Sequence, residues 1–494
     1  MNKLRLLFVF KSVEWLGVEY LSSSLQKAGH ETDLAFESGL EGTFYFKAKK
    51  KSHLDILKKI DTFKPDVILF SSTTNLFSWV KEVALQIKQK YNLPIIAGGI
   101  HPTIQPDKVI AEKDIDIICI GEGEEAIVEL ANKMEKKQDY TKTKNLWFKK
   151  DGKIIKNPVR PLLKNLDLLP NPDKDIFYKY GCFTDRVYLM TSRGCPYKCT
   201  YCFNHQIQNL YKDMGIGYFR RRSLNLIIDE LKAYIKKYKI KSVHFYDDTF
   251  ILDKNWVLKF AEEYKKEIGL PFYCLVRANL VDSEIIKALK SAGCKAVSMG
   301  VESGNEYIRN ILLKRNMQNE EIVNAARIIK ENKIKLITFN IFGFPGETPE
   351  QMLDTMKINL QIKPDSLFTY VFYPFPGTDL MKIALEKKFI DQNVYQKIME
   401  GAGDYQSESL LNHPFKEVAY NMKVILPLLN KFPKSTHSYF LSKWVYKRHS
   451  KIFLSMLKIV AIPFYSSWES KQRLKEQISM LKIHYKNKLF NRVL

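Results

Sequence analysis

Three cysteines stand close together in the run TSRGCPYKCTYCFN, at positions 195, 199 and 202. Their C-x3-C-x2-C spacing supplies three thiolates, whereas four-iron clusters normally take four. A three-thiolate set leaves one iron with an open site, where a small molecule can chelate and receive an electron. We therefore interpret Cys195, Cys199 and Cys202 as ligands of a catalytic [4Fe–4S] cluster. The alternative is a closed tetrahedral zinc site in which His205 is the fourth ligand.

A series of alternating strand and helix patterns follows residue 186 and would position these cysteines. Strands are expected at Val187–Thr191, Ser242–Tyr246, Phe272–Val276, Ala296–Gly300, Leu336–Phe342 and Ser366–Phe372. Helices are expected at Leu224–Tyr238, Asn255–Ile268, Ser283–Ala292, Glu320–Asn332 and Pro349–Gln361. Six βα units at this spacing predict a partial (β/α)6 barrel of the TIM type. In such barrels, function resides at the carboxyl ends of the strands.

Charged residues and glycines follow most of these expected strands. The first strand leads into the cysteine loop, and the next three end in Asp247 and Asp248, in Arg277 and in Glu302. The fifth ends in GFPGET, which begins at Gly343. All of these residues would meet at one rim, an arrangement that a zinc knuckle does not need. The competing interpretation is that the three acids only cap helix N-termini.

The first 140 residues show a similar rhythm, which predicts a Rossmann-like, doubly wound parallel sheet. Apolar runs occur at Leu4–Phe10, Thr32–Phe36, Val67–Ser71, Ile95–Ala97 and Ile115–Ile120, and amphipathic segments at Glu14–Ala28 and Leu76–Tyr91. Small residues follow three of the runs: Ser71, Ser72 and Thr73, then Gly98 and Gly99, then Gly121, Glu122 and Gly123. Three such loops at one sheet edge would let a bulky ligand approach the backbone closely.

Turn and proline signals divide the chain further. A hairpin is expected around Asp151-Gly152, and prolines between Leu166 and Asp175 mark a connector. After about Asp391 the strand rhythm stops, and a helical, aromatic and basic region follows. We therefore expect a Rossmann-like domain at 1–140, a hairpin and linker at 141–185, the barrel at 186–390 and a helical C-terminal region at 391–494.

Composition indicates the compartment in which the protein works and the surfaces it could contact. Four isolated cysteines (Cys119, Cys182, Cys274 and Cys294) are expected to be small buried hydrophobes in a reducing compartment. No apolar run is long enough to span a bilayer, so a cytoplasmic location is expected. The net charge is +24, and the last 61 residues carry thirteen Lys or Arg against two Glu. This region, which includes Phe453–Trp468, could lie on an anionic membrane, cover a lipid-like substrate, cap the barrel mouth or be a solvated helical face.

Over roughly residues 1–390 the chain resembles the cobalamin-binding radical S-adenosylmethionine enzymes. The motifs that carry the resemblance are CPYKCTYC, DDTF, GVESG, GFPGET, GGIHPT and GEGE. The resemblance implies that the methionine groups of S-adenosylmethionine fill the open iron site. Reduction by an external donor such as flavodoxin or ferredoxin would then yield a 5′-deoxyadenosyl radical.

The resemblance also implies residue roles. For S-adenosylmethionine these are Tyr201 beside the adenine, Asp247 and Asp248 at the amino group, Arg277 at the carboxylate, Glu302 at the ribose and Gly343 near the adenine or substrate. Ser71 to Thr73, Gly98, Gly99 and Gly121 to Gly123 would surround cobalamin. The D-x-H-x-x-G motif is absent, so His101 is not assigned to cobalt; a loop or surface role is expected for it. A degenerate module without cobalamin is the alternative.

The expected activity is radical methylation of a carbon in an unidentified small-molecule or lipid-like substrate, with cobalamin as the methyl carrier. No catalytic side chain is assigned. Radical rearrangement or oxidative cyclisation is the alternative within the class. Methylthiolation of tRNA fits poorly, because only Cys119 lies in the N-terminal domain. A zinc-bearing RNA-binding protein is the alternative from another class, but the apolar strands lack the exposed aromatic pattern that it needs, so nucleic acid is not expected.

Overall fold

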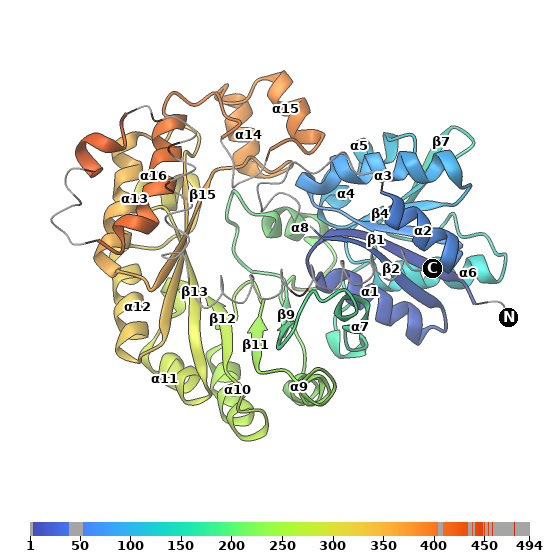
Figure 1. Cartoon of the computed structure of the whole chain (residues 1–494), viewed down its shortest axis with the longest axis horizontal. Helices are drawn as coiled ribbons and strands as arrows, with labels where there is room; N and C mark the ends of the chain where they lie inside the picture. Colours follow the sequence, from blue (N-terminus) through green and yellow to red (C-terminus); the bar gives the residue numbers. More distant parts are fainter. Residues whose placement is uncertain are drawn as a thin grey trace, which may run out of the picture.

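The computed structural model describes residues 3–38, 53–403 and 409–432, and beyond them only 437, 440–447, 449, 453, 457 and 479. Two sheets organise these residues, and Figure 1 shows them side by side with α8 (Phe203–Tyr211) between them. The described residues contain no helix that is both long and apolar enough to cross a membrane. Most of the basic C-terminal region, including nearly all of Phe453–Trp468, lies outside the described residues.

The first sheet has seven strands in the order β2-β1-β3-β4-β5-β6-β7. They are β1 (Arg5–Ser12), β2 (Glu31–Ser38), β3 (Val67–Ser71), β4 (Ile95–Gly98), β5 (Ile117–Cys119), β6 (Leu146–Lys150) and β7 (Lys153–Lys156). The first five are parallel, and their 2-1-3-4-5 order is the flavodoxin-like variant of the doubly wound fold. In this topology a ligand binds at the carboxyl ends of the strands, at the switch point between β1 and β3.

Helices cover both faces of this sheet, as its apolar strands require. Residues of α1 (Leu16–Lys27), α6 (Glu124–Glu135) and α7 (Asp175–Tyr178) pack on one face, and residues of α2 (Leu54–Phe63), α3 (Phe77–Lys90) and α5 (Pro106–Ala111) on the other. The β6–β7 hairpin, expected between the domains, pairs with β5 and extends the sheet. Its turn places Asp151 at φ 50° and Gly152 at φ 72°, the positive angles that a tight hairpin turn needs.

The second sheet has six parallel strands in the order β15-β14-β13-β12-β11-β8 and confirms the predicted partial barrel. The strands are β8 (Arg186–Leu189), β11 (Ser242–Phe245), β12 (Phe272–Val276), β13 (Cys294–Glu302), β14 (Lys335–Phe342) and β15 (Ser366–Val371). Five helices follow the strands in turn: α9 (Leu224–Tyr238), α10 (Lys254–Glu267), α11 (Ser283–Ser291), α12 (Asn319–Glu331) and α13 (Pro349–Ile362). Each expected barrel element therefore exists, within about two residues of its predicted bounds.

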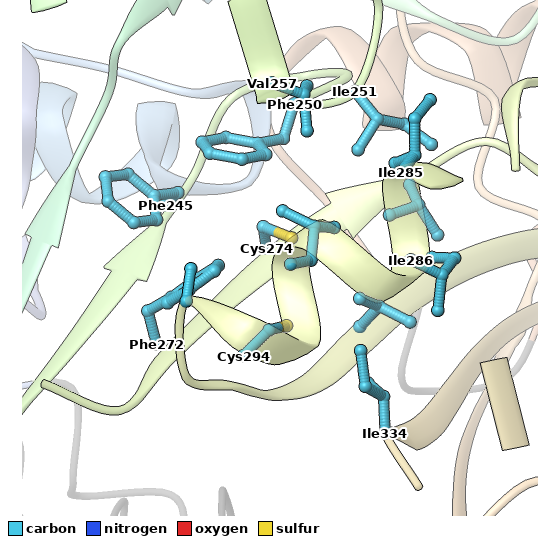
Figure 2. Close-up of a cluster of buried hydrophobic side chains, with 14 of the residues drawn as sticks. Phe245, Phe250, Ile251, Val257, Phe272, Cys274, Ile285, Ile286, Cys294 and Ile334 are labelled. Atoms are coloured by element: carbon cyan, nitrogen blue, oxygen red, sulfur yellow. The ribbon is translucent and has the colours of Figure 1, made fainter. Parts of the chain in front are cut away.

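The barrel core lies between the strands and the outer helices. Figure 2 shows part of it, where Phe245, Phe250 and Phe272 lie near Cys274 and Cys294. Both cysteines are buried and form no disulfide, and the same holds for Cys119 and Cys182. This confirms the prediction that the isolated cysteines are small buried hydrophobes.

Further helices follow the barrel: α14 (Asp379–Glu386), α15 (Gln392–Met399) and α16 (Lys416–Leu429). Residues of α16 pack against β14, β15 and α13, so this helix covers the open edge of the six-stranded sheet. A short π-helical segment, η5 (Tyr307–Leu312), lies between β13 and α12. These elements complete the surroundings of the cysteine loop.

Candidate functional site

The cysteine loop, residues 194–202, is held at its start and near its end. It leaves the short strand β9 (Ser192–Arg193) through Gly194, whose φ is +87° and whose Cβ would lie 2.4 Å from the Tyr218 carbonyl oxygen. No side chain fits there, so the position requires glycine. Near its end, the Thr200 N–H and Oγ1 donate to the carbonyls of Leu313 (3.2 Å) and Leu312 (2.6 Å). The loop is therefore a rigid part of the barrel rim.

Each of the three thiols has a polar side chain beside it, and each of these side chains comes from a different element. Cys195 Sγ lies 3.9 Å from Thr249 Oγ1, after β11, and Cys202 Sγ lies 3.8 Å from Asn204 Nδ2, on α8. Cys199 Sγ lies 3.9 Å from Nη1 of Arg277, which directly follows β12. Thiolates bound to iron only accept hydrogen bonds, so a donor beside each sulfur suits a cluster ligand.

Burial keeps two of these thiols protonated in the free protein. It raises the pKa of Cys202 to about 12 and also raises the pKa of Cys195, and the neighbouring Asp248 charge acts in the same direction. A metal must therefore displace protons when it binds, which is usual for thiolate sites. The loop thus fits a cluster whose positive iron ions compensate the desolvated sulfurs.

A single zinc ion fits the same loop poorly. Within the described ranges, no group of three or more His, Cys, Asp and Glu side chains is arranged to hold one metal ion. Zinc ligands must converge to about 2.0–2.3 Å from one centre, whereas each ligand of a cluster binds a different iron. In addition, His205 Nδ1 lies 3.1 Å from Asp379 Oδ2 on α14. The geometry favours the cluster over the Cys3His alternative.

The two aspartates after β11 differ in their surroundings. Asp247 is fully buried and accepts hydrogen bonds from the Thr191 N–H (3.1 Å), Thr191 Oγ1 (2.6 Å) and Ser192 Oγ. It therefore ties the end of β11 to the end of β8. Asp248 faces a cavity, and its Oδ1 accepts from Asn204 Nδ2 at 3.0 Å. Burial raises the pKa of both carboxyls. Of the pair, Asp248 has the oxygen that a ligand can reach.

Glu302 lies at a bulge between β13 and β14 and has a φ of +62°. Arg315 Nη1 stands 3.5 Å from its Oε1 and donates to the Tyr201 hydroxyl at 2.6 Å. Arg315 Nη2 also donates to the Gly300 carbonyl at 2.8 Å. Burial raises the pKa of Glu302, and the Arg315 charge opposes that rise. Tyr201 and Glu302, which were expected to contact one nucleoside, are thus joined by an arginine that the motifs did not reveal.

The GFPGET loop folds around its own glutamate. Glu347 is fully buried, and its Oε2 accepts the N–H groups of Gly343 (2.7 Å) and Phe344 (3.1 Å). Burial raises the pKa of Glu347 to about 8, against the lowering effect of these two bonds. Gly343 has a φ of +79°, which favours glycine. The carboxyl therefore shapes the loop beside the rim.

One cavity of about 340 Å³ joins the two halves of the molecule. Six of the residues predicted to surround cobalamin line it: Ser71, Gly98, Gly99, Gly121, Glu122 and Gly123. From the barrel, Gly194, Asn204 and Asp248 line it. Ser72 and Thr73 do not line it; Ser72 is buried behind Gly99, whose Cβ would lie 2.9 Å from the Ser72 nitrogen. The cavity lies at the carboxyl ends of the first sheet, where its topology predicts a ligand.

Ionic contacts hold the two halves together beside this cavity. Glu122 accepts from Arg220 (2.6 and 3.0 Å) and from Arg193 (3.3 Å), and Arg193 also donates to Glu124 (2.6 Å). Burial alone would raise the pKa of Glu122, but the Arg220 hydrogen bond and the Arg193 charge lower it overall. The carboxylate of Glu122 is thus directed to arginines, and only its remaining surface faces the cavity.

His101 lies neither at the surface nor in a loop, which corrects both roles expected for it. Only 1% of it is exposed, its Nδ1 lies 3.2 Å from Thr74 Oγ1, and its ring packs against Phe77. Burial lowers its pKa to about 4, so it is a neutral residue of the short helix α4 (Ile100–Ile104), which follows β4. This placement agrees with leaving it unassigned to cobalt.

A second cavity, of about 660 Å³, lies inside the barrel. Its lining includes Tyr273 and Ser298, and lysines near the amino ends of strands, such as Lys241 and Lys335. None of the residues that line it belongs to the cysteine loop. This cavity is therefore separate from the cysteine loop.

Comparisons with known proteins agree with the two-part geometry. A B12 binding domain matches residues 8–131, and the radical SAM superfamily matches residues 189–358. An uncharacterized methyltransferase of Pyrococcus horikoshii is 29% identical over 76% of this chain and 79% of its own length. An anaerobic magnesium-protoporphyrin IX monomethyl ester cyclase of Rubrivivax gelatinosus is 26% identical over 85% of this chain and 78% of its own length.

Solved structures share the fold along the whole chain. The methyltransferase TsrM of Kitasatospora setae, solved with cobalamin and a [4Fe–4S] cluster, has a TM-score of 0.67 at 16% identity and covers 99% of this chain and 100% of its own. OxsB with aqua-cobalamin and S-adenosylmethionine has a TM-score of 0.66 at 16% identity, over 97% of this chain and 76% of its own. The two matched domains imply S-adenosylmethionine, a [4Fe–4S] cluster and cobalamin as cofactors. The chain thus combines a B12 binding domain with a domain of the radical SAM superfamily.

Proposed function

We propose that this enzyme transfers a methyl group to a carbon atom of a small-molecule substrate inside the cavity between its two halves. One observation carries the proposal. The loops at the carboxyl ends of the first sheet and the residues beside the cysteine loop line the same cavity. When bound, the cofactors supply a 5′-deoxyadenosyl radical and a cobalt-carried methyl group. A shared cavity would let both act on one substrate carbon without diffusion of a reactive species.

Within this proposal, Cys195, Cys199 and Cys202 hold the cluster. Asp248 receives the amino group of S-adenosylmethionine, because its carboxylate faces the cavity and Asn204 links it to Cys202. Glu302 and Tyr201 meet the nucleoside, and Arg315 holds both of them in place. Arg277 is left out of this set, because its guanidinium contacts the cysteine loop instead.

For cobalamin, the proposed contacts are backbone surfaces. A Cβ on Gly121 would lie 1.9 Å from the Tyr211 hydroxyl, and one on Gly99 would collide with the backbone of Ser72. Both glycines have positive φ angles, +78° and +98°. Where loops carry no side chains, a ligand can lie flat and close against the backbone. This suits a large planar ligand better than a small one.

Product analysis tests methyl transfer. The full-length protein is reconstituted anaerobically with iron, sulfide and cobalamin, and incubated with reductant, methyl-labelled S-adenosylmethionine and fractionated small-molecule extracts. We expect 5′-deoxyadenosine, S-adenosylhomocysteine and a labelled product, none of which should form with Cys199→Ala. S-adenosylhomocysteine distinguishes methylation from the cyclisation named in one relative, because only methyl transfer yields it. Turnover with 5′-deoxyadenosine but without S-adenosylhomocysteine would reject the proposal.

We further propose that the basic C-terminal region brings the enzyme to anionic membrane surfaces. Its thirteen Lys and Arg among 61 residues support this, since each basic residue near such a surface contributes about 1 kcal/mol. Co-sedimentation with vesicles of anionic or neutral lipid compares the full chain with a chain that ends at Pro433. Selective binding of the full chain to the anionic vesicles is expected, and equal partition of both forms would remove the idea.

A further inference from the structure

The three thiols differ in the charge of their polar neighbours. Cys195 faces a hydroxyl and Cys202 faces an amide, both neutral. Cys199 alone faces a guanidinium, with Nη1 of Arg277 at 3.9 Å from its sulfur. Because hydrogen bonds to the sulfurs and nearby charge set the potential of an iron–sulfur cluster, this difference has a redox consequence.

Arg277 cannot swing away from Cys199. Only 6% of it is exposed, its Nη2 donates to the Arg315 carbonyl, and its guanidinium carbon lies 3.7 Å from the centre of the Tyr197 ring. Tyr197 belongs to the cysteine loop itself. The cation is therefore fixed to the same structure that carries the thiols, between a stacked ring and a carbonyl.

Arg277 also has no carboxylate partner. Among the residues that the structure describes, no Asp or Glu oxygen lies within ion-pair distance of it, whereas Arg315 has Glu302 at 3.5 Å. A buried cation normally requires a compensating negative charge. Glu302 feels the Arg277 charge only from beyond that distance, whereas Cys199, as an iron-bound thiolate, would carry a negative charge in direct contact with the guanidinium.

We propose that Arg277 is a redox-positioning residue, whose fixed charge beside Cys199 raises the reduction potential of the cluster. The step concerned is the passage of one electron from a low-potential carrier of the flavodoxin or ferredoxin class to the oxidised cluster. No proton moves and no protein bond breaks. The added negative charge is stabilised by the guanidinium, because the surroundings have a low dielectric constant. This inference rests on the proposed cluster at Cys199 but not on methyl transfer.

A redox titration tests it. The full-length protein is reconstituted anaerobically without S-adenosylmethionine or cobalamin, and the reduced cluster is followed by electron paramagnetic resonance as the potential is lowered. We expect Arg277→Gln to shift the reduction equilibrium about tenfold toward the oxidised state. For a one-electron couple this lowers the reduction potential by about 59 mV. Arg277→Lys keeps a charge but not the planar fork, so a smaller fall is expected.

Two variants serve as controls. Arg309→Gln removes another fully buried arginine, which donates to the Ser303 and Met317 carbonyls and touches no thiol, so the potential should stay unchanged. Thr249→Val removes a neutral neighbour of Cys195 and should shift the potential less than Arg277→Gln. Iron content per chain confirms that each variant holds its cluster.

The outcomes are distinct. A fully loaded Arg277→Gln with the wild-type potential, or an equal shift in Arg309→Gln, would overturn the inference. If Arg277→Gln retains too little iron, Arg277→Lys decides: a lower potential supports the inference, and an equal or higher one overturns it. Failure of the wild-type chain to form a four-iron cluster would instead refute the proposed function.

Discussion

Asp247 and Asp248 are adjacent in the sequence, yet the structure predicts different consequences when each is replaced by asparagine. Asp248→Asn removes the charge that faces the cavity and preserves the size of the side chain. Asp247→Asn alters a fully buried group that accepts from Thr191 and Ser192. The first change should weaken binding of S-adenosylmethionine, and the second should weaken the fold.

The magnitudes follow from the contacts. A hydrogen bond to a charged group is worth about 1.5–3 kcal/mol, so loss of the Asp248 charge should raise the Kd of S-adenosylmethionine about 10- to 150-fold. Asp247→Asn places an amide N–H₂ opposite donors, which leaves at least one buried donor unsatisfied. That costs about 1–3 kcal/mol of folding free energy and should lower the melting temperature by several degrees.

Calorimetric titration of S-adenosylmethionine into anaerobic, cluster-loaded protein measures the first effect, and thermal unfolding measures the second. Asp247→Asn should bind with close to the wild-type Kd once corrected for its folded fraction. The reasoning is refuted if Asp247→Asn, fully folded and loaded with iron, loses as much affinity as Asp248→Asn. It is equally refuted if Asp248→Asn binds as tightly as the wild type.

Three further changes test other parts of the site. Gly99→Ala should lower the cobalamin retained per chain after gel filtration, because its Cβ would meet backbone at 2.9 Å, whereas Gly152→Ala, with a positive φ but nothing within 4 Å, should not. Glu347 has a pKa of about 8 in the fold against an ordinary 4.5, so the folded state binds more protons and wild-type stability should fall as pH rises from 4.5 to 8. The melting temperature of Glu347→Gln should therefore rise relative to that of the wild type across this pH range. A difference in melting temperature that does not change with pH would contradict the reasoning. Glu122→Gln should weaken its bonds to Arg220 by about 1.5–3 kcal/mol, seen as faster hydrogen exchange in α8 and β9 but not in α10.

The sequence predicted the scaffold well, because the strands are short apolar runs separated by amphipathic segments. Val67–Ser71 and Phe272–Val276 are continuous apolar runs, and the structure gives them the same bounds. Because parallel strands end at one edge of a sheet, the sequence also predicts that the loops after them lie close together. The hairpin at Asp151-Gly152 was also foreseen, but not its pairing with β5, which requires knowledge of which edge is free.

The contacts between distant segments could not be predicted in this way. Arg315 meets Glu302 and Tyr201, and Arg220 meets Glu122 98 residues away, but an arginine can reach its partner from many positions. The run of three arginines at 220–222 was the sequence signal for the contact with Glu122, because buried arginines are almost always paired. Which of Asp247 and Asp248 faces the cavity was likewise open, since the side chains alternate beyond a strand end whose exact register the sequence does not give.

Helix α8 connects the two regions to which the proposed function assigns the cofactors. Cys202 directly precedes its first residue, and Tyr211 is its last; the Tyr211 hydroxyl accepts from the Glu122 N–H at 3.1 Å and lies where a Cβ on Gly121 would be. A helix of nine residues is about 13 Å long and stiff, so it sets the separation between the cysteine loop and the loop after β5. In the proposed function, a radical formed at one end must meet its substrate before water or protein does, and a fixed separation inside one cavity favours this. Substitutions along α8 should therefore change the amount of product formed per 5′-deoxyadenosyl radical more than they change the affinity for either cofactor.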